Sequence, residues 1–138
     1  MIDEIDKKII EELSKNSRIS MRELGEKIFL TGQATSTRVA KLEDMKIIKG
    51  YTLEVDYSLI GKAIHVILNI YTNSPQHYYY LKFIDSQKDN LLHNYKISGD
   101  GCYLIEARFS TTEELDEFLL KLNKYANYKL TIILKDII

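Results

Sequence analysis

Apolar residues recur with helical spacing in three stretches of the first 50 residues. Between residues 3 and 15 they recur at intervals of three and four, which is typical of an amphipathic helix with Asp3 as its N-cap. Ser20-x-x-Glu23 is a capping box that predicts a second helix, and Thr31 is suited to cap a third helix ending near Asp44. We expect the second helix to bury Met21, Leu24 and Ile28.

From residue 47 onward the pattern becomes that of β-strands. Residues 47–56 favour a strand because Leu53 and Val55 alternate with acidic residues, and residues 57–62 read as a connection. Further strands are expected at residues 63–71, 91–98, 102–109 and 128–136, with Gly99-Asp100-Gly101 as a hairpin turn between the middle two.

Two more helices are expected between these strands. Ser74-Pro75 predicts one start, with proline at the first helical position, and Thr111-x-x-Glu114 is a capping box for the other. Tyr78, Tyr80, Leu81, Phe83 and Ile84 are expected to form the apolar side of the first of these helices. The order strand–helix–strand–strand–helix–strand is the split βαβ, or ferredoxin-like, arrangement.

The predicted fold class is α+β, with two domains. An N-terminal winged-helix-type helix-turn-helix domain spans residues 1–50, and residues 51–61 form a linking strand and connection. A ferredoxin-like βαββαβ domain with an antiparallel sheet spans residues 62–138. Its first strand carries apolar residues on both faces, so the face with Ile67 could pair with the sheet of a second subunit.

Charge is unevenly distributed along the chain. The net charge of the 138 residues is −1, yet residues 18–50 carry seven basic against four acidic side chains, a net charge of +3. This basic segment coincides with the two-helix unit, which favours an anionic partner for the second helix of that unit.

Composition excludes several other classes of site. Cys102 is the single cysteine, so neither an intramolecular disulfide nor a thiolate metal cluster can form, and this fits a reducing cytosol. His65, His77 and His93 lack metal-ligand spacing, and we expect no metal and no cofactor. Without a long apolar run or a signal-peptide pattern, we expect a cytoplasmic protein with no membrane partner.

In a helix-turn-helix, the second helix enters the major groove of double-stranded DNA. Gln33 is suited to adenine, Arg38 to guanine, and Ser36 or Thr37 to a base or a phosphate. The side chains better placed for backbone phosphates are Arg18, Arg22, Thr31 and Lys41, and Ser20 completes the predicted DNA-binding set.

The chain resembles the Lrp/AsnC family of transcription regulators over essentially its whole length. The resemblance rests on Ile5-Asp6-x-Lys8-Ile9-Ile10-x-x-Leu13, Asn16-Ser17-Arg18-x-Ser20, Glu23-Leu24, Leu30-Thr31, Ala34, Ser36, Arg38-Val39, Leu42-Glu43, Ile47-Ile48, Gly50-Tyr51, Leu59-Ile60-Gly61 and Ser98-Gly99-Asp100. It implies a sequence-specific regulator that forms dimers, often octamers, with small effectors such as amino acids sensed at the second domain. The implied effector residues are Ser98, Gly99, Asp100, Gly101 and Cys102.

Three positions depart from the family pattern. Phe29 and Lys46 stand where the family usually has glycine, so a left-handed backbone there costs about 1 kcal/mol each, although Phe29 brings apolar area for packing. After Gly99-Asp100 the chain continues with Gly101-Cys102 and lacks the family's next aspartate, which weakens the expectation of amino-acid sensing.

Two other functions compete with regulation through DNA. One is a ligand-sensing or oligomerisation module whose DNA binding is weakened by the changes at Phe29 and Lys46. The other is a tetrapyrrole decarboxylase on the same scaffold, which would need a polar pocket with a general acid–base pair. The histidines are scattered and no such pair is visible, so we expect no catalytic residues and no enzyme activity.

Overall fold

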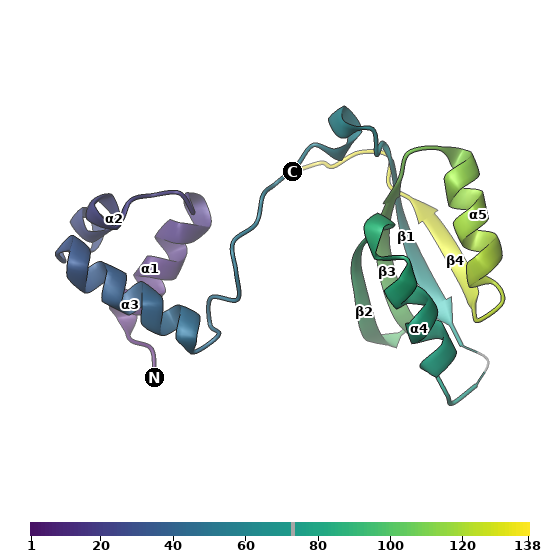
Figure 1. Ribbon diagram of the computed structural model, residues 1–138, viewed down its shortest axis with the longest axis horizontal. Helices are drawn as coiled ribbons and strands as arrows, with labels where there is room; N and C mark the ends of the chain where they lie inside the picture. Colours follow the sequence, from purple (N-terminus) through teal and green to yellow (C-terminus); the bar gives the residue numbers. More distant parts are fainter. Residues whose placement is uncertain (73) are drawn as a thin grey trace. The chain divides into compact units, whose positions relative to one another are not determined.

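Three helices make up the first part of the chain in the computed structural model, which describes residues 1–72 and 74–138 (Figure 1). The chain divides into unit 1, Met1–Glu54, and unit 2, Val55–Ile138. Unit 1 contains α1 (Glu4–Lys15), α2 (Met21–Ile28) and α3 (Gly32–Asp44), which confirms the expected helix-turn-helix elements.

Each helix of unit 1 begins directly after the residue that the sequence predicts as its cap. The side chains of Asp3, Ser20 and Thr31 accept hydrogen bonds from backbone amides in the first turns of α1, α2 and α3. The three helices share one apolar core, which consists of Ile9, Leu13, Ile19, Leu24, Ile28, Val39 and Leu42. The expectation that Met21 is buried was wrong, because its side chain is only partly buried at the edge of this core.

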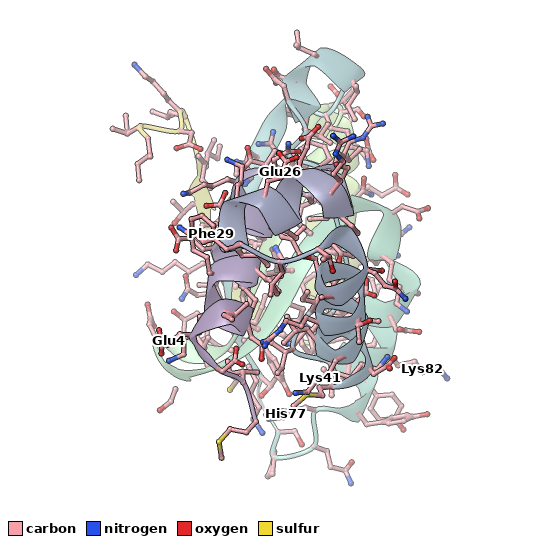
Figure 2. The ribbon with its side chains drawn as sticks, turned by 90° about the vertical axis from the view of Figure 1, so that its left-hand side faces the viewer. Glu4, Glu26, Phe29, Lys41, His77 and Lys82 are labelled. Atoms are coloured by element: carbon pink, nitrogen blue, oxygen red, sulfur yellow. The ribbon has the colours of Figure 1, made fainter. Side chains whose placement is uncertain are left out.

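The turn between α2 and α3 keeps a left-handed backbone without glycine. Phe29 has φ 61° and ψ 41°, and its side chain is 93% exposed, so the expectation that it packs was wrong (Figure 2). Lys46, after α3, has φ 60°. Glycine is needed at position 25 of α2 for a steric reason. A Cβ there would lie 2.5 Å from the Leu30 carbonyl oxygen.

The strand predicted at residues 47–56 is absent from the described chain. Its apolar residues alternate as expected, but no other strand of this chain pairs with it, and Leu53 is 78% exposed. A strand needs a hydrogen-bonded neighbour, so residue propensity alone is insufficient here.

Unit 2 has the ferredoxin-like arrangement that the sequence predicts. After a short 3₁₀ turn, η1 (Tyr57–Ile60), the elements are β1 (Ile64–Tyr71), α4 (Tyr78–Ser86), a second 3₁₀ turn η2 (Lys88–Asn90), β2 (Leu91–Gly99), β3 (Gly101–Phe109), α5 (Thr112–Leu122) and β4 (Asn127–Ile132). The strands pair antiparallel in the order β2-β3-β1-β4, which confirms the α+β class.

Two boundaries in unit 2 differ from the predictions. The closing strand was expected to reach residue 136, but β4 ends at Ile132, opposite Val66 near the start of β1. Helix α4 begins at Tyr78 and not at Ser74-Pro75, because the Ser74 hydroxyl accepts from the Gln76 amide and closes a local turn. Residue 73, just before this point, lies outside the described residues.

Only part of the tyrosine-rich helix covers the core. Tyr80, Phe83 and Ile84 are buried, whereas Tyr78 and Leu81 are 61% and 43% exposed, so the prediction that both lie on the apolar side was wrong. Because an α-helix has 3.6 residues per turn, Tyr78 and Leu81 point away from the sheet when Tyr80 faces it.

Helices α4 and α5 cover one face of the sheet (Figure 1). Val66, Leu68 and Ile70 of β1 are fully buried beneath them. The alternate residues of β1, including His65 and Ile67, point to the other face, which we call the open face. Within residues 1–72 and 74–138, no helix combines the length and apolar character needed to cross a membrane.

Candidate functional site

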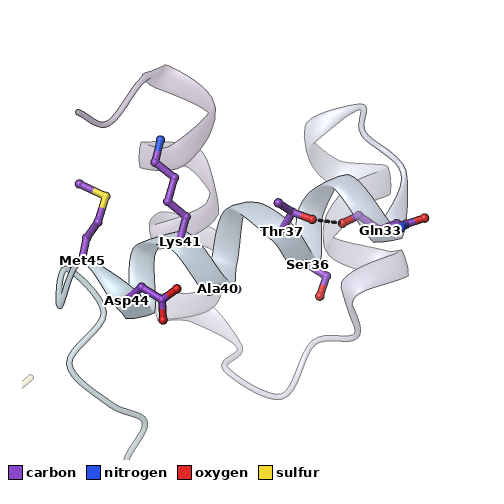
Figure 3. A pocket seen from close by; sticks show the side chains of 7 residues that line it. All are labelled: Gln33, Ser36, Thr37, Ala40, Lys41, Asp44 and Met45. Carbon is purple, nitrogen blue, oxygen red and sulfur yellow. Dashed lines mark hydrogen bonds between the residues drawn. The ribbon is translucent and has the colours of Figure 1, made fainter.

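The exposed side of α3 forms a shallow hollow on unit 1. Because 3.6 residues complete one turn, residues spaced by three, four and seven positions align along this side. The lining side chains are Gln33, Ser36, Thr37, Ala40, Lys41, Asp44 and Met45 (Figure 3). We call these seven residues the α3 face.

Most hydrogen-bonding groups of the α3 face have no internal partner. The Thr37 hydroxyl donates to the Gln33 carbonyl oxygen at 3.1 Å, as the dashed line in Figure 3 shows. Among the described residues, the Gln33 amide and the Lys41 ammonium make no hydrogen bond or ion pair with other side chains. They are therefore available to an external partner.

The other predicted contact residues of the helix-turn-helix have different roles. The Ser20 and Thr31 hydroxyls accept from the Glu23 and Ala34 amides, each at 3.1 Å, so both act as helix caps. The Arg22 side chain is 88% exposed and lies 3.6 Å from Glu26, a separation at which an exposed pair contributes little. Arg18 is exposed in the connection before α2.

Arg38 is the predicted contact residue whose surroundings differ most from expectation. Its Nη1 atom donates to both carboxylate oxygens of Asp3, at 2.9 and 2.8 Å, and to Asp6 at 3.1 Å. Asp6 is only 1% exposed, so Arg38 neutralises a buried carboxylate of α1. This geometry favours a structural role for Arg38 and disagrees with the guanine contact expected from the sequence.

The Arg38 contacts shift the titration of both partners. The hydrogen bond from Arg38 lowers the pKa of Asp3 from 3.8 to about 2, helped by the backbone amide of Asp6. The same bond raises the pKa of the Arg38 guanidinium. Both groups are therefore fully charged at neutral pH.

Sequence reasoning missed part of this site. Ala40 and Asp44 follow Gln33 and Lys41 at helical spacing, so the periodicity could have placed them on the α3 face. The role of Asp3 and Asp6 had no such signal, because these residues lie more than thirty positions from Arg38 in the chain.

The predicted effector residues form the β2–β3 turn of unit 2, which we call the 98–102 turn. The Asp100 carboxylate accepts from the Tyr71 hydroxyl at 2.5 Å and lies 3.6 Å from Lys129 Nζ. The Asn69 amide donates to the Asp100 carbonyl oxygen at 2.9 Å. A Cβ at Gly101, with φ +102°, would lie 2.7 Å from the Ile70 carbonyl oxygen, so only glycine fits this close approach.

Cys102 is connected to a short chain of polar groups. The Thr72 hydroxyl lies 3.5 Å from the Cys102 sulfur and 2.9 Å from His77 Nε2, and His77 Nδ1 lies 2.8 Å from the Tyr103 hydroxyl. The hydrogen bond from Thr72 lowers the pKa of the Cys102 thiol. Asp100 of this turn and Lys129 of β4 place two opposite charges side by side next to this chain.

Comparison with known proteins adds independent information. Residues 2–49 match the family model for winged helix-turn-helix DNA-binding domains. The chain is 55% identical to the HTH-type transcriptional regulator LrpA of Bacillus subtilis over 134 residues, which cover 97% of this chain and 98% of LrpA.

Two solved structures extend this similarity. The structure of B. subtilis LrpC has 36% sequence identity and a TM-score of 0.91, with 99% of this chain and 97% of LrpC covered. The feast or famine regulatory protein of M. tuberculosis, complexed with L-methionine, has 21% identity and a TM-score of 0.92, with 100% and 95% covered, and it shares the fold.

Proposed function

The chain belongs to the Lrp/AsnC family of helix-turn-helix transcriptional regulators, and we propose that it binds double-stranded DNA through the α3 face. Its relatives are transcriptional regulators and not enzymes, so the decarboxylase alternative does not apply. The observation that carries the proposal is that the Gln33 amide and the Lys41 ammonium, on an exposed helix of a helix-turn-helix, have no side-chain partner among the described residues.

The proposed contacts follow from the free groups on this face. Gln33 lies in the first turn of α3, where its amide can pair with adenine, and Ser36 and Thr37 lie beside it for bases or phosphates. Lys41 carries the single positive charge of the α3 face and is assigned to a phosphate.

Four flanking residues complete the proposed interface. Arg18 and Arg22 are assigned to phosphates. Ser20 and Thr31 cap the N-termini of α2 and α3, and we assign these two helix N-termini to the DNA backbone. Arg38 is left out as a base reader because Asp3 and Asp6 hold it.

The alternative with weakened DNA binding depended on Phe29 and Lys46. Both residues adopt the left-handed backbone that glycine would otherwise supply, with φ 61° and 60°. Because both residues keep the left-handed turn geometry, the position of α3 in the helix-turn-helix is maintained. This supports a DNA-binding protein over a module that only senses a ligand.

Fluorescence anisotropy with DNA fragments selected from the source genome tests the proposal. We expect Lys41→Ala to weaken binding and to reduce the slope of log affinity against log salt by about 1. Gln33→Ala should relax discrimination at one adenine by about 1–3 kcal/mol. Lys82→Ala, an exposed lysine on α4, is the charge-matched control. Unchanged binding by both α3 variants would overturn the groove assignment.

We further propose that the protein is a homodimer. The open face carries Ile67 and Leu104 without a covering helix, and the extended residues 51–55 expose apolar side chains without a strand partner in the described chain. A second copy would satisfy both features at once.

An amino-acid effector is proposed for the 98–102 turn. The M. tuberculosis protein of the same fold is described with L-methionine. Here the Asp100 carboxylate and the Lys129 ammonium lie 3.6 Å apart, a pair that suits the two charges of a free amino acid. Calorimetry with L-methionine and other amino acids should show binding that Asp100→Asn abolishes. Equal binding by this variant would refute the assignment.

A further inference from the structure

A chain of polar contacts crosses the open face near the start of β1. The Glu106 carboxylate on β3 lies 2.6 Å from His65 Nε2, and the Arg108 guanidinium, also on β3, lies 3.2 Å from His65 Nδ1. His65 is therefore held on both ring nitrogens, by an anion on one side and a cation on the other.

Arg108 extends this chain to the segment that precedes β1. Its Nη1 donates to the Lys62 carbonyl oxygen at 3.2 Å, and its guanidinium carbon lies 5.0 Å above the ring centre of Tyr57. Its Nε atom is buried and has no hydrogen-bond partner among the described residues. Residues 57–62, which we call the connection, are thus held to β3 by Arg108, while the Lys62 ammonium donates to the Asp89 carbonyl oxygen and to Asn90 Oδ1 at 2.8 and 3.2 Å.

The donor and acceptor roles are fixed by the chemistry of arginine. A guanidinium donates only, so His65 Nδ1 must accept with its lone pair, and the proton of the neutral ring lies on Nε2, where it faces Glu106. Protonation of the ring places a hydrogen on Nδ1. Two donors then oppose each other across the Arg108 contact, while the Glu106 contact becomes an ion pair and strengthens.

We propose that His65 is a proton-sensitive latch for the connection. In the neutral state His65 holds Arg108 over Tyr57 and against Lys62. When the ring takes up a proton, Arg108 leaves His65, and the connection loses its contacts with Arg108 while Lys62 keeps its bonds to Asp89 and Asn90.

The charged and titratable groups around His65 must be compared to identify the group that takes up the proton. On β3 these are Glu106 and Arg108, and on β2 His93 stands opposite Glu106. The connection and its flanks contribute Asp56, Tyr57 and Lys62, and the segment after β4 contributes Lys135 and Asp136. Of these, only His65 and His93 are histidines, which ordinarily titrate between about pH 5 and 8. The His93 ring stacks on Tyr95, and among the described residues no hydrogen bond joins it to Arg108.

Asp56 provides an alternative partner for the released arginine. The hydrogen bond from the Ser58 hydroxyl is the main cause that lowers the pKa of Asp56. The positive charge of Arg108 lowers this pKa further. Asp56 therefore remains an anion near the connection in both states of the latch.

Hydrogen exchange of the full-length protein at about pH 5.5 and 7.5 tests the latch. The reporters are the amides of Leu59 and Lys62, which donate to Asp56 and Tyr57 carbonyl oxygens at 3.1 and 2.8 Å. After correction for intrinsic rates, their protection should fall about tenfold at the lower pH, which corresponds to the loss of about one hydrogen bond.

His65→Gln is the decisive variant, because a neutral amide can accept from Arg108 and donate to Glu106 at both pH values. We expect its protection to be independent of pH, and His93→Gln, the matched control, to behave like the wild type. Unchanged pH dependence in His65→Gln, or constant protection in the wild type, would overturn the proposal.

A second measurement covers the case in which His65→Gln does not fold. In an NMR titration of the wild-type protein, the Tyr57 ring signals should follow the same curve as the His65 ring signals. A Tyr57 ring that does not respond, or that follows His93, would also refute the latch. Neither experiment contains DNA, so their outcomes are independent of the proposed function.

Discussion

Arg38 and Asp6 are 32 residues apart in the chain, yet the guanidinium Nη1 lies 3.1 Å from the carboxylate of an aspartate that is 1% exposed. Asp3, at the cap of α1, binds the same nitrogen. These bonds attach the first turn of α1 to the side of α3. The orientation of α3 therefore depends on two carboxylates that do not belong to the helix-turn-helix itself.

Replacement of Arg38 should affect folding more than base recognition. Arg38→Ala leaves the buried Asp6 carboxylate without its charge partner, so we expect a clear fall in the urea midpoint of unfolding. Lys41→Ala, on the exposed side of the same helix, should change stability by no more than about 0.5 kcal/mol. Urea denaturation followed by circular dichroism measures both. An Arg38→Ala protein as stable as Lys41→Ala would contradict the structural role.

The Asp3–Arg38 pair also predicts a dependence of stability on acid pH. Because the pKa of Asp3 falls from 3.8 to about 2 on folding, the pair stabilises the folded state above about pH 4. This contribution is lost as the pH falls through the folded value. Asp3→Asn keeps a good N-cap residue but removes the charge. The difference in unfolding free energy between wild type and Asp3→Asn should shrink between about pH 4 and pH 2. A constant difference would be inconsistent with the pair.

Local signals predicted the three helices of unit 1, and the missing strand is explained by the absence of a long-range partner in the described chain. Asp3, Ser20 and Thr31 cap their helices because capping depends on residues three positions away. Residues 47–56 have strand-forming residues but no neighbouring strand in the described chain, and pairing is a non-local property.

The candidate site likewise contains residues that the sequence predicted and contacts that it did not. Gln33, Ser36, Thr37 and Lys41 follow from helical spacing, and all four lie on the α3 face. The surroundings of Arg38 could not be predicted, because Asp3 and Asp6 are brought to it only when α1 packs against α3.

Phe29 predicts a stabilising substitution. Its backbone is left-handed and its side chain is 93% exposed, so it has strain without compensating burial. Phe29→Gly should raise the free energy of unfolding by about 1 kcal/mol, because glycine adopts this conformation without a Cβ clash. Phe29→Ala keeps the Cβ and serves as the matched control. Thermal unfolding should place Phe29→Gly above Phe29→Ala, and the reverse order would contradict backbone strain at position 29.

The open face predicts how the subunits associate. Leu104 lies on β3 beside Glu106 and opposite Asn69 of β1, on the face that no helix of the described chain covers. Leu104→Glu places a charge in the proposed subunit interface and should convert the dimer to a monomer whose circular dichroism is unchanged. Leu120→Glu introduces the same charge at a leucine of α5 that is 66% exposed, and it should leave the dimer intact. Sedimentation equilibrium distinguishes these outcomes. A Leu104→Glu protein with wild-type mass would show that the subunits associate through a different surface, and the unpaired residues 51–55 would then be the next region to alter.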